Sequence, residues 1–108
     1  MRYKIFNISV YDGDTITADI DLGFGLVITK QKIRLCGLDT PEVRGTEKEE
    51  GIKVRDDLIE KLKYMKGEME PNPDYEKCKY GRWLATIYNT DGENINKWLL
   101  DSGRATHM

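Results

Sequence analysis

The clearest pattern in the chain is the alternation of residue types from Thr15 to Asp21. Isoleucine or alanine occupies positions 16, 18 and 20, and polar side chains occupy the positions between them. Because successive side chains of a strand point to opposite faces, this run predicts a strand with one buried and one wet face. Asp12-Gly13 signals a tight turn before it, with positive φ at the glycine, and joins it to a strand-like run from Tyr3 to Val10.

The next segments predict a third strand and then a helix. A turn at Leu22 to Gly25 leads into a long strand-like run, Leu26 to Leu35. Thr46 and Glu49 then have the spacing of a capping box, in which each side chain bonds the other residue's free backbone N–H. We therefore expect a helix from Thr46 to Gly67. Its apolar residues at helical spacing are Ile52, Leu58, Ile59, Leu62 and Met65.

The second half of the chain predicts two more strands and a short helix. Glu68 to Lys79 holds two prolines and several acids, which favours a loop. Arg82 to Tyr88 alternates again and predicts a fourth strand, and a turn leads to a short fifth strand around Glu93 to Ile95. Asn96 is the expected cap of a helix over Lys97 to Ser102. The pattern predicts a small α+β domain, mainly antiparallel, with a helix after the third strand and another after the fifth.

Length and composition indicate one domain over residues 1–108. The chain is 39% hydrophobic and 33% charged, and no apolar run approaches the roughly 20 residues of a membrane span. Asn7 and Ser9 interrupt any signal-peptide core, so we expect a cytoplasmic, intracellular or phage-encoded protein with no membrane partner. The formal net charge of −2 argues against a tight passive binder of nucleic acid and is tolerable for an enzyme.

A charged corner follows the third predicted strand. Arg34, Asp39 and Glu42 lie within nine residues, and Pro41 ends any regular structure there. A guanidinium beside two carboxylates is what a phosphate-cleaving site with a hard cation requires. On this stretch alone, a turn with a surface ion pair remains the alternative.

Two further motifs accompany this corner. The sequences DGDT (residues 12–15), IRLCGLDTPE (33–42) and KYGRWLA (79–85) occur in this order and at this spacing. Together they resemble the staphylococcal nuclease (thermonuclease) family, over about residues 10–105. The resemblance implies a five-stranded OB-fold barrel. It also implies a nuclease, with endonuclease action the expected mode, that hydrolyses phosphodiester bonds of DNA and/or RNA.

The resemblance also assigns roles to individual residues. Arg34 and Arg82 match the two guanidinium groups that grip the phosphate and stabilise the phosphorane, and Arg82 also assists the leaving oxygen. Glu42 matches the general base that takes a proton from the attacking water, and its alternative is a rim carboxylate. Lys79 and Tyr80 would line the substrate side, or else flank a solvated hairpin.

The expected cofactor is Ca²⁺. Asp14 and Asp39 match the family's metal-binding carboxylates, and the Thr40 carbonyl matches its main-chain ligand. Oxygen ligands suit a hard cation, and from the chemistry alone Mg²⁺ or Mn²⁺ is as defensible. Asp12 is expected to be a turn or outer-shell residue.

The chain departs from the family at three places. It ends before the family's final helix, so it is a short form, expected to be a monomer with weaker nucleotide affinity or a tendency to self-associate. The basic loop is reduced to Val43-Arg44-Gly45, and the segment before KYGR is acidic. A non-catalytic OB module that binds nucleic acid or protein is therefore the alternative function.

Overall fold

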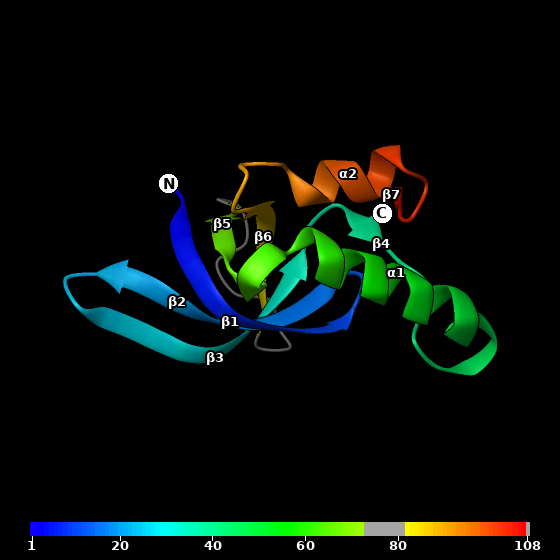
Figure 1. The fold of residues 1–108 in the computed structure, drawn as a ribbon, viewed down its shortest axis with the longest axis horizontal. Helices are drawn as coiled ribbons and strands as arrows, with labels where there is room; N and C mark the ends of the chain where they lie inside the picture. Colours follow the sequence, from blue (N-terminus) through cyan, green and yellow to red (C-terminus); the bar gives the residue numbers. More distant parts are fainter. Residues whose placement is uncertain (73–81, 108) are drawn as a thin grey trace.

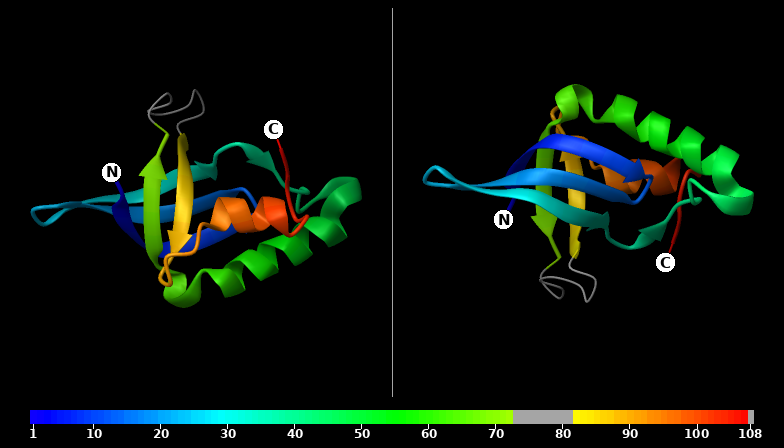
Figure 2. Two further views of the ribbon diagram at one scale, coloured as in Figure 1. Left: turned by 90° about the horizontal axis from the view of Figure 1, so that it is seen from above. Right: turned by 90° about the horizontal axis from the view of Figure 1, so that it is seen from below.

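The computed structural model describes residues 1–72 and 82–107 and contains a closed five-stranded barrel (Figures 1 and 2). The barrel strands are β1 (Tyr3–Asp12), β2 (Thr15–Gly23), β3 (Leu26–Leu35), β5 (Gly67–Pro71) and β6 (Arg82–Asn89). Their order around the barrel is β1-β2-β3-β6-β5, with β3 and β6 parallel and the other pairs antiparallel. This confirms the predicted OB-fold barrel, whose strand order requires a crossover between β3 and β6.

Helices and a two-stranded sheet complete the structure. The remaining elements are β4 (Leu38–Asp39), η1 (Gly45–Glu47), α1 (Lys48–Lys61), η2 (Lys63–Met65), α2 (Ile95–Asp101) and β7 (Thr106–His107). β7 pairs with β4, so the segment after α2 returns to the residues that follow β3. Figure 1 shows the β2–β3 hairpin extending away from the barrel at the end opposite the start of α1. No helix in the described ranges has both the length and the apolar character needed to cross a membrane.

The buried face of the barrel follows the predicted alternation. Ile16, Ala18 and Ile20 are at most 3% exposed, and they face side chains from every other barrel strand. The largest fully buried side chains are Ile5, Ile16, Ile33, Leu35, Leu38, Leu58, Leu62, Met69, Ile87, Ile95 and Leu99. Burial of each such side chain stabilises the folded state by about 1.5–3 kcal/mol relative to leaving it exposed. The core therefore fixes the register of the strands that carry the site.

The fourth barrel strand lies where a loop was predicted. Gly67–Pro71 pairs with β1 on one side and β6 on the other, so backbone hydrogen bonds hold it although few of its side chains are apolar. The close approach of β5 to β6 requires glycine at position 67, because a Cβ there would overlap the Tyr88 carbonyl oxygen. The prediction of a fifth strand at Glu93–Ile95 was wrong: Tyr88 and Asn94 form only an isolated bridge there.

The helix ends also differ from the predictions. α1 begins at Lys48 after a 3₁₀ turn and ends at Lys61, with no side-chain cap at its N-terminus, so the Thr46–Glu49 capping box does not form. α2 is capped by Asn94 and not by Asn96. The Asn94 Oδ1 accepts a hydrogen bond from the Lys97 N–H at 3.0 Å.

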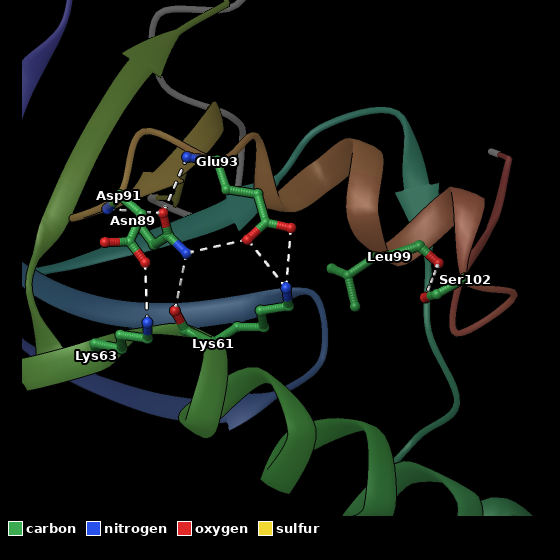
Figure 3. Close-up of polar contacts among 7 residues, drawn as sticks. All are labelled: Lys61, Lys63, Asn89, Asp91, Glu93, Leu99 and Ser102. Carbon is green, nitrogen blue, oxygen red and sulfur yellow. Dashed lines mark hydrogen bonds and ion pairs between the residues drawn. The ribbon is translucent and has the colours of Figure 1, made fainter.

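A polar network joins the end of α1 to the turn between β6 and α2 (Figure 3). Lys61 forms an ion pair with Glu93 at 2.9 Å, and Lys63 forms one with Asp91 at 3.0 Å. The buried Asn89 donates to the Lys61 carbonyl at 3.2 Å and accepts from the N–H groups of Asp91 and Glu93. The network fixes α1 and α2 against the same end of β6.

Bulges in β1 and β3, the two strands that flank β2, meet at one carboxylate of β2, Asp19. Each bulge places a residue with positive φ in a strand, Asn7 in β1 (51°) and Lys30 in β3 (52°). Asp19 accepts a hydrogen bond from the Lys30 N–H at 2.9 Å and another from Asn7 Nδ2 at 3.0 Å. The sequence pattern had placed Asp19 on a merely solvated face. In the structure it stabilises two bulges that increase the local twist of the sheet.

We expect Asp19→Ala to lower the midpoints of thermal and urea unfolding, because it removes both hydrogen bonds. Asp19→Asn, which keeps one acceptor oxygen, should have the smaller effect. The Lys30 N–H and then Asn7 lower the pKa of Asp19 below its ordinary value of 3.8. Its contribution is therefore present above that value and is lost as the pH falls through the lowered pKa. Unfolding midpoints of Asp19→Ala equal to those of the wild type at neutral pH would contradict this role.

Candidate active site

Residues from each of the three motifs line one cleft. Its volume is about 480 Å³. Its lining residues are Tyr11, Asp12, Asp14, Thr15, Thr17, Lys32, Arg34, Asp39, Thr40, Glu42 and Arg82. The predicted residues Asp14, Arg34, Asp39, Thr40, Glu42 and Arg82 are among them. Lys79 and Tyr80 lie outside the described residues and stay predictions.

Arg34 is held between two carboxylates from different elements. Its Nη2 lies 2.6 Å from Asp39 Oδ1 and 3.4 Å from Asp14 Oδ2. The register of β2 and β3 produces this contact, because Thr15, which follows Asp14, pairs directly with Arg34. The Arg34 and Asp14 side chains are nearly buried, whereas the Asp39 side chain is 55% exposed. The two carboxylates fix the orientation of this guanidinium in the cleft lining.

Asp14 connects the two loops that form the cleft wall. Its Oδ2 accepts from the Thr40 N–H at 3.3 Å, and its backbone carbonyl accepts from the Leu35 N–H at 2.9 Å. Burial, together with the hydrogen bond and charge of Asp14, raises the pKa of Asp12 to about 6. In this partly buried place the charge of Asp14 opposes the ionisation of Asp12.

Gly13 has a steric role that differs from the predicted one. It is not among the glycines with positive φ. A Cβ at this position would lie 2.6 Å from a methyl carbon of Val54 and 2.8 Å from the Thr40 side chain. The glycine therefore lets the β1–β2 turn lie against both α1 and the corner that holds Asp39.

Glu42 lies at the mouth of the cleft, where α1 packs against its backbone. A Cβ on Gly51 would overlap the Glu42 carbonyl oxygen, so this contact requires glycine. The Glu42 N–H donates to Glu47 at 3.5 Å, and the residue remains exposed. Its carboxylate is therefore accessible to water on a backbone that α1 fixes.

Arg82 reaches the same cleft through the parallel pairing of β3 and β6. Lys32 pairs with Arg82, and Arg34 pairs with Leu84 two residues later. Both guanidinium-bearing residues therefore belong to one continuous pair of strands.

The buried side chain of Asn96 closes the end of this strand pair. Its Nδ2 donates to the carbonyl oxygens of Cys36 and Ala85, each at 3.2 Å, and its Oδ1 accepts from the Ile87 N–H at 3.0 Å. Cys36 follows Arg34 by two residues, so Asn96 fixes the strand ends behind the site.

The donor set fits a hard cation. Two carboxylates, on Asp14 and Asp39, contact the same nitrogen of Arg34, and the Thr40 hydroxyl oxygen is buried without a hydrogen-bond partner in the described part of the chain. Oxygen ligands of this kind suit Ca²⁺ or Mg²⁺. Among residues 1–72 and 82–107, however, no three acidic, His or Cys side chains converge as a metal site. A cation would therefore depend on Thr40 and water oxygens as well.

A sequence model of the staphylococcal nuclease homologue family matches residues 32–108, which is more than half of the chain. The chain belongs to this family. A curated relative, the succinoglycan biosynthesis protein ExoI of Rhizobium meliloti (strain 1021), is 27% identical over 107 residues, covering 90% of this chain and 48% of that protein. An uncharacterized endonuclease of Escherichia coli O157:H7 is 29% identical over 101 residues, covering 91% of this chain and 56% of that protein.

This homologue spans about half the length of the curated relatives it matches. Its cleft also contains residues to which the motifs assign no role: Tyr11, Thr15, Thr17 and Lys32. Thr15 and Thr17 lie on one face of the strand that the alternation predicted, and Lys32 pairs with Thr17 from the predicted third strand. Their position could therefore have been inferred from strand pairing, but their chemistry could not.

Proposed function

We propose that the chain is a metal-dependent nuclease, with Ca²⁺ as the preferred ion, that hydrolyses phosphodiester bonds of DNA and/or RNA. The observation that supports this most directly is the convergence of Arg34, Arg82 and Glu42 on the cleft wall formed by Asp14 and Asp39. Two guanidinium groups and an exposed carboxylate are the groups that water attack on a phosphodiester requires.

In this proposal each side chain has a defined step. Arg34 and Arg82 donate hydrogen bonds to the phosphate oxygens and stabilise the charge that grows as water attacks phosphorus. Glu42 takes the proton of that water as the new P–O bond forms and the bond to the leaving oxygen breaks. Arg82 also donates to the leaving oxygen.

Asp14, Asp39 and Thr40 would hold the cation. When bound, it supplies positive charge that polarises the phosphate. The charge of the cleft gives a further reason to expect a bound cation, because four acidic and three basic residues line the cleft. That lining alone does not attract a polyanion, and a divalent ion reverses its net sign.

We expect cleavage of a fluorophore-quencher single-stranded oligonucleotide in the presence of Ca²⁺, Mg²⁺ or Mn²⁺ and none with a chelator. Asp39→Asn should raise the ion concentration needed by at least about tenfold. Asp101→Asn, an exposed carboxylate in α2, should leave it unchanged and serves as the matched control.

Cleavage that is equally fast in the chelator would contradict metal dependence. A folded protein that cleaves neither DNA nor RNA with any of the three ions would favour the non-catalytic OB module. Circular dichroism on the same samples establishes that the protein is folded in each arm.

A further inference from the structure

Tyr11 occupies an unusual place at the mouth of the cleft. Val10 pairs with Ile16 and Asp12 pairs with Thr15, so Tyr11 is the extra residue of a bulge in β1. Bulges beside functional sites change the direction in which a side chain points. Here the bulge places an aromatic ring in the lining of the cleft, although the alternation of β1 does not predict a residue there.

Arg44 holds this ring at its edge. The Arg44 Nη2 donates a hydrogen bond to the Tyr11 hydroxyl, and the guanidinium carbon lies 5.9 Å from the ring centroid. Tyr11 is nevertheless 49% exposed. The guanidinium therefore fixes the hydroxyl end of the ring and leaves ring surface open to solvent.

Arg44 also has N–H donors beyond the one that bonds the Tyr11 hydroxyl. Within residues 1–72 and 82–107, no carboxylate forms an ion pair with it, whereas Arg2, Arg34, Arg55 and Arg104 all have acidic partners. A guanidinium has five N–H donors, and the Tyr11 hydroxyl uses one of them. The pair thus offers an aromatic face and a cation beside each other, and Tyr11 shares the cleft lining with Arg34 and Arg82.

We propose that Tyr11 and Arg44 form a nucleotide-binding subsite, in which a base adjacent to the cleaved phosphodiester stacks on Tyr11 and its phosphate bonds Arg44. Stacking on an aromatic ring is tolerant of base identity, and a guanidinium accepts any phosphate, so the subsite selects a single-stranded nucleotide and not a particular sequence. This inference rests on the proposed nuclease function, because it supplies the substrate class of the same cleft.

The test is an abasic scan. A short oligothymidylate and its variants, each with one base removed, are titrated in Ca²⁺ against two proteins. Both carry Glu42→Gln to prevent cleavage, and they differ only in having the wild-type Tyr11 or Tyr11→Ala. For the wild type, base removal at one position should weaken binding about 5- to 100-fold, the range that loss of a stacking aromatic gives. Tyr11→Ala should bind all the oligonucleotides equally weakly.

Two variants separate stacking from a structural role. Tyr11→Phe keeps the ring and loses the bond to Arg44, so it should retain the base dependence. If it behaves like Tyr11→Ala, the contact is only structural and the proposal is overturned. Tyr64→Ala, an exposed tyrosine beyond the C-terminal end of α1, should bind like the wild type.

Salt dependence tests Arg44. Arg44→Ala should reduce the slope of log affinity against log salt by about 0.7, the value for one phosphate contact on a single strand. Arg2→Ala, at the opposite end of β1, should leave the slope unchanged. An unchanged slope for Arg44→Ala would overturn its assigned contact.

The outcomes distinguish the subsite from the nuclease proposal. Base-dependent binding by a wild type that cannot cleave would support the subsite and remove the proposed function. Cleavage that is indifferent to base removal at every position would do the opposite. The absence of any binding would overturn the subsite, whereas the nuclease proposal is decided by the cleavage assay.

Discussion

Glu42→Gln is expected to lower kcat by about 10²- to 10⁴-fold, the usual contribution of a general base. Glutamine has the same length and keeps a carbonyl oxygen, so the backbone contact between Glu42 and Gly51 should survive. What it loses is the ability to take a proton from the attacking water. Because the variant leaves Arg34 and Arg82, the proposed phosphate-binding groups, unchanged, KM should change little. Single-turnover cleavage with saturating enzyme measures the chemical step.

The matched control is Glu60→Gln, an exposed carboxylate in the C-terminal half of α1. It removes the same charge and should leave kcat unchanged. If Glu42→Gln cleaves at the wild-type rate, another group accepts the proton and Glu42 is a rim carboxylate. If both variants lose activity equally, the loss reflects net charge and not proton transfer.

Strands with buried side chains could be predicted from the sequence, and strands held mainly by their backbone could not. The β2 alternation was visible because Ile16, Ala18 and Ile20 enter the core. β5 gave no such signal, since Gly67 and Met69 are its only buried residues and Pro71 ends it. Its two neighbours supply the hydrogen bonds that make it a strand, and that information is not local.

The same contrast applies to the site. The motifs that contain Arg34, Glu42 and Arg82 identified residues that the structure brings to one cleft. Tyr11 was assigned no role and Asn96 was predicted only as a helix cap, because the positions they take arise from tertiary geometry. A bulge directs Tyr11 into the cleft, and Asn96 lies in the first turn of α2, where the helix packs on β6.

Asn96→Asp is expected to lower the free energy of unfolding, and by more than Asp19→Ala does. The amide nitrogen that donates to the Cys36 and Ala85 carbonyls would become a carboxylate oxygen facing both of them in a buried place. Repulsion and burial would raise the pKa of the new carboxyl group above its value in the unfolded chain. At a pH above the folded and the unfolded pKa, each tenfold loss of acidity lowers the free energy of unfolding by about 1.4 kcal/mol. A roughly 100- to 1,000-fold loss of acidity would therefore remove about 3–4 kcal/mol, a large part of the stability of a small domain.

The sign of the pH dependence follows from the raised pKa. Below the unfolded pKa, near 4 for an aspartate, the carboxyl group is protonated in both states and the penalty is smallest. As the pH rises towards the folded pKa, the unfolded state ionises first, so the variant loses stability relative to the wild type. Urea unfolding of both proteins from about pH 4 to pH 7 measures this difference. A constant difference across that range would show that the carboxylate is solvated.

Asn94→Asp is the control, because aspartate caps a helix as well as asparagine does and the side chain lies at the N-terminus of α2. Its stability should equal that of the wild type at both ends of the pH range. Under conditions where Asn96→Asp remains folded, kcat should also fall, since the Asn96 side chain fixes the ends of the strands that carry Arg34 and Arg82. Full activity in that folded variant would limit Asn96 to stability and leave the alignment of the two arginines to the strand pairing itself.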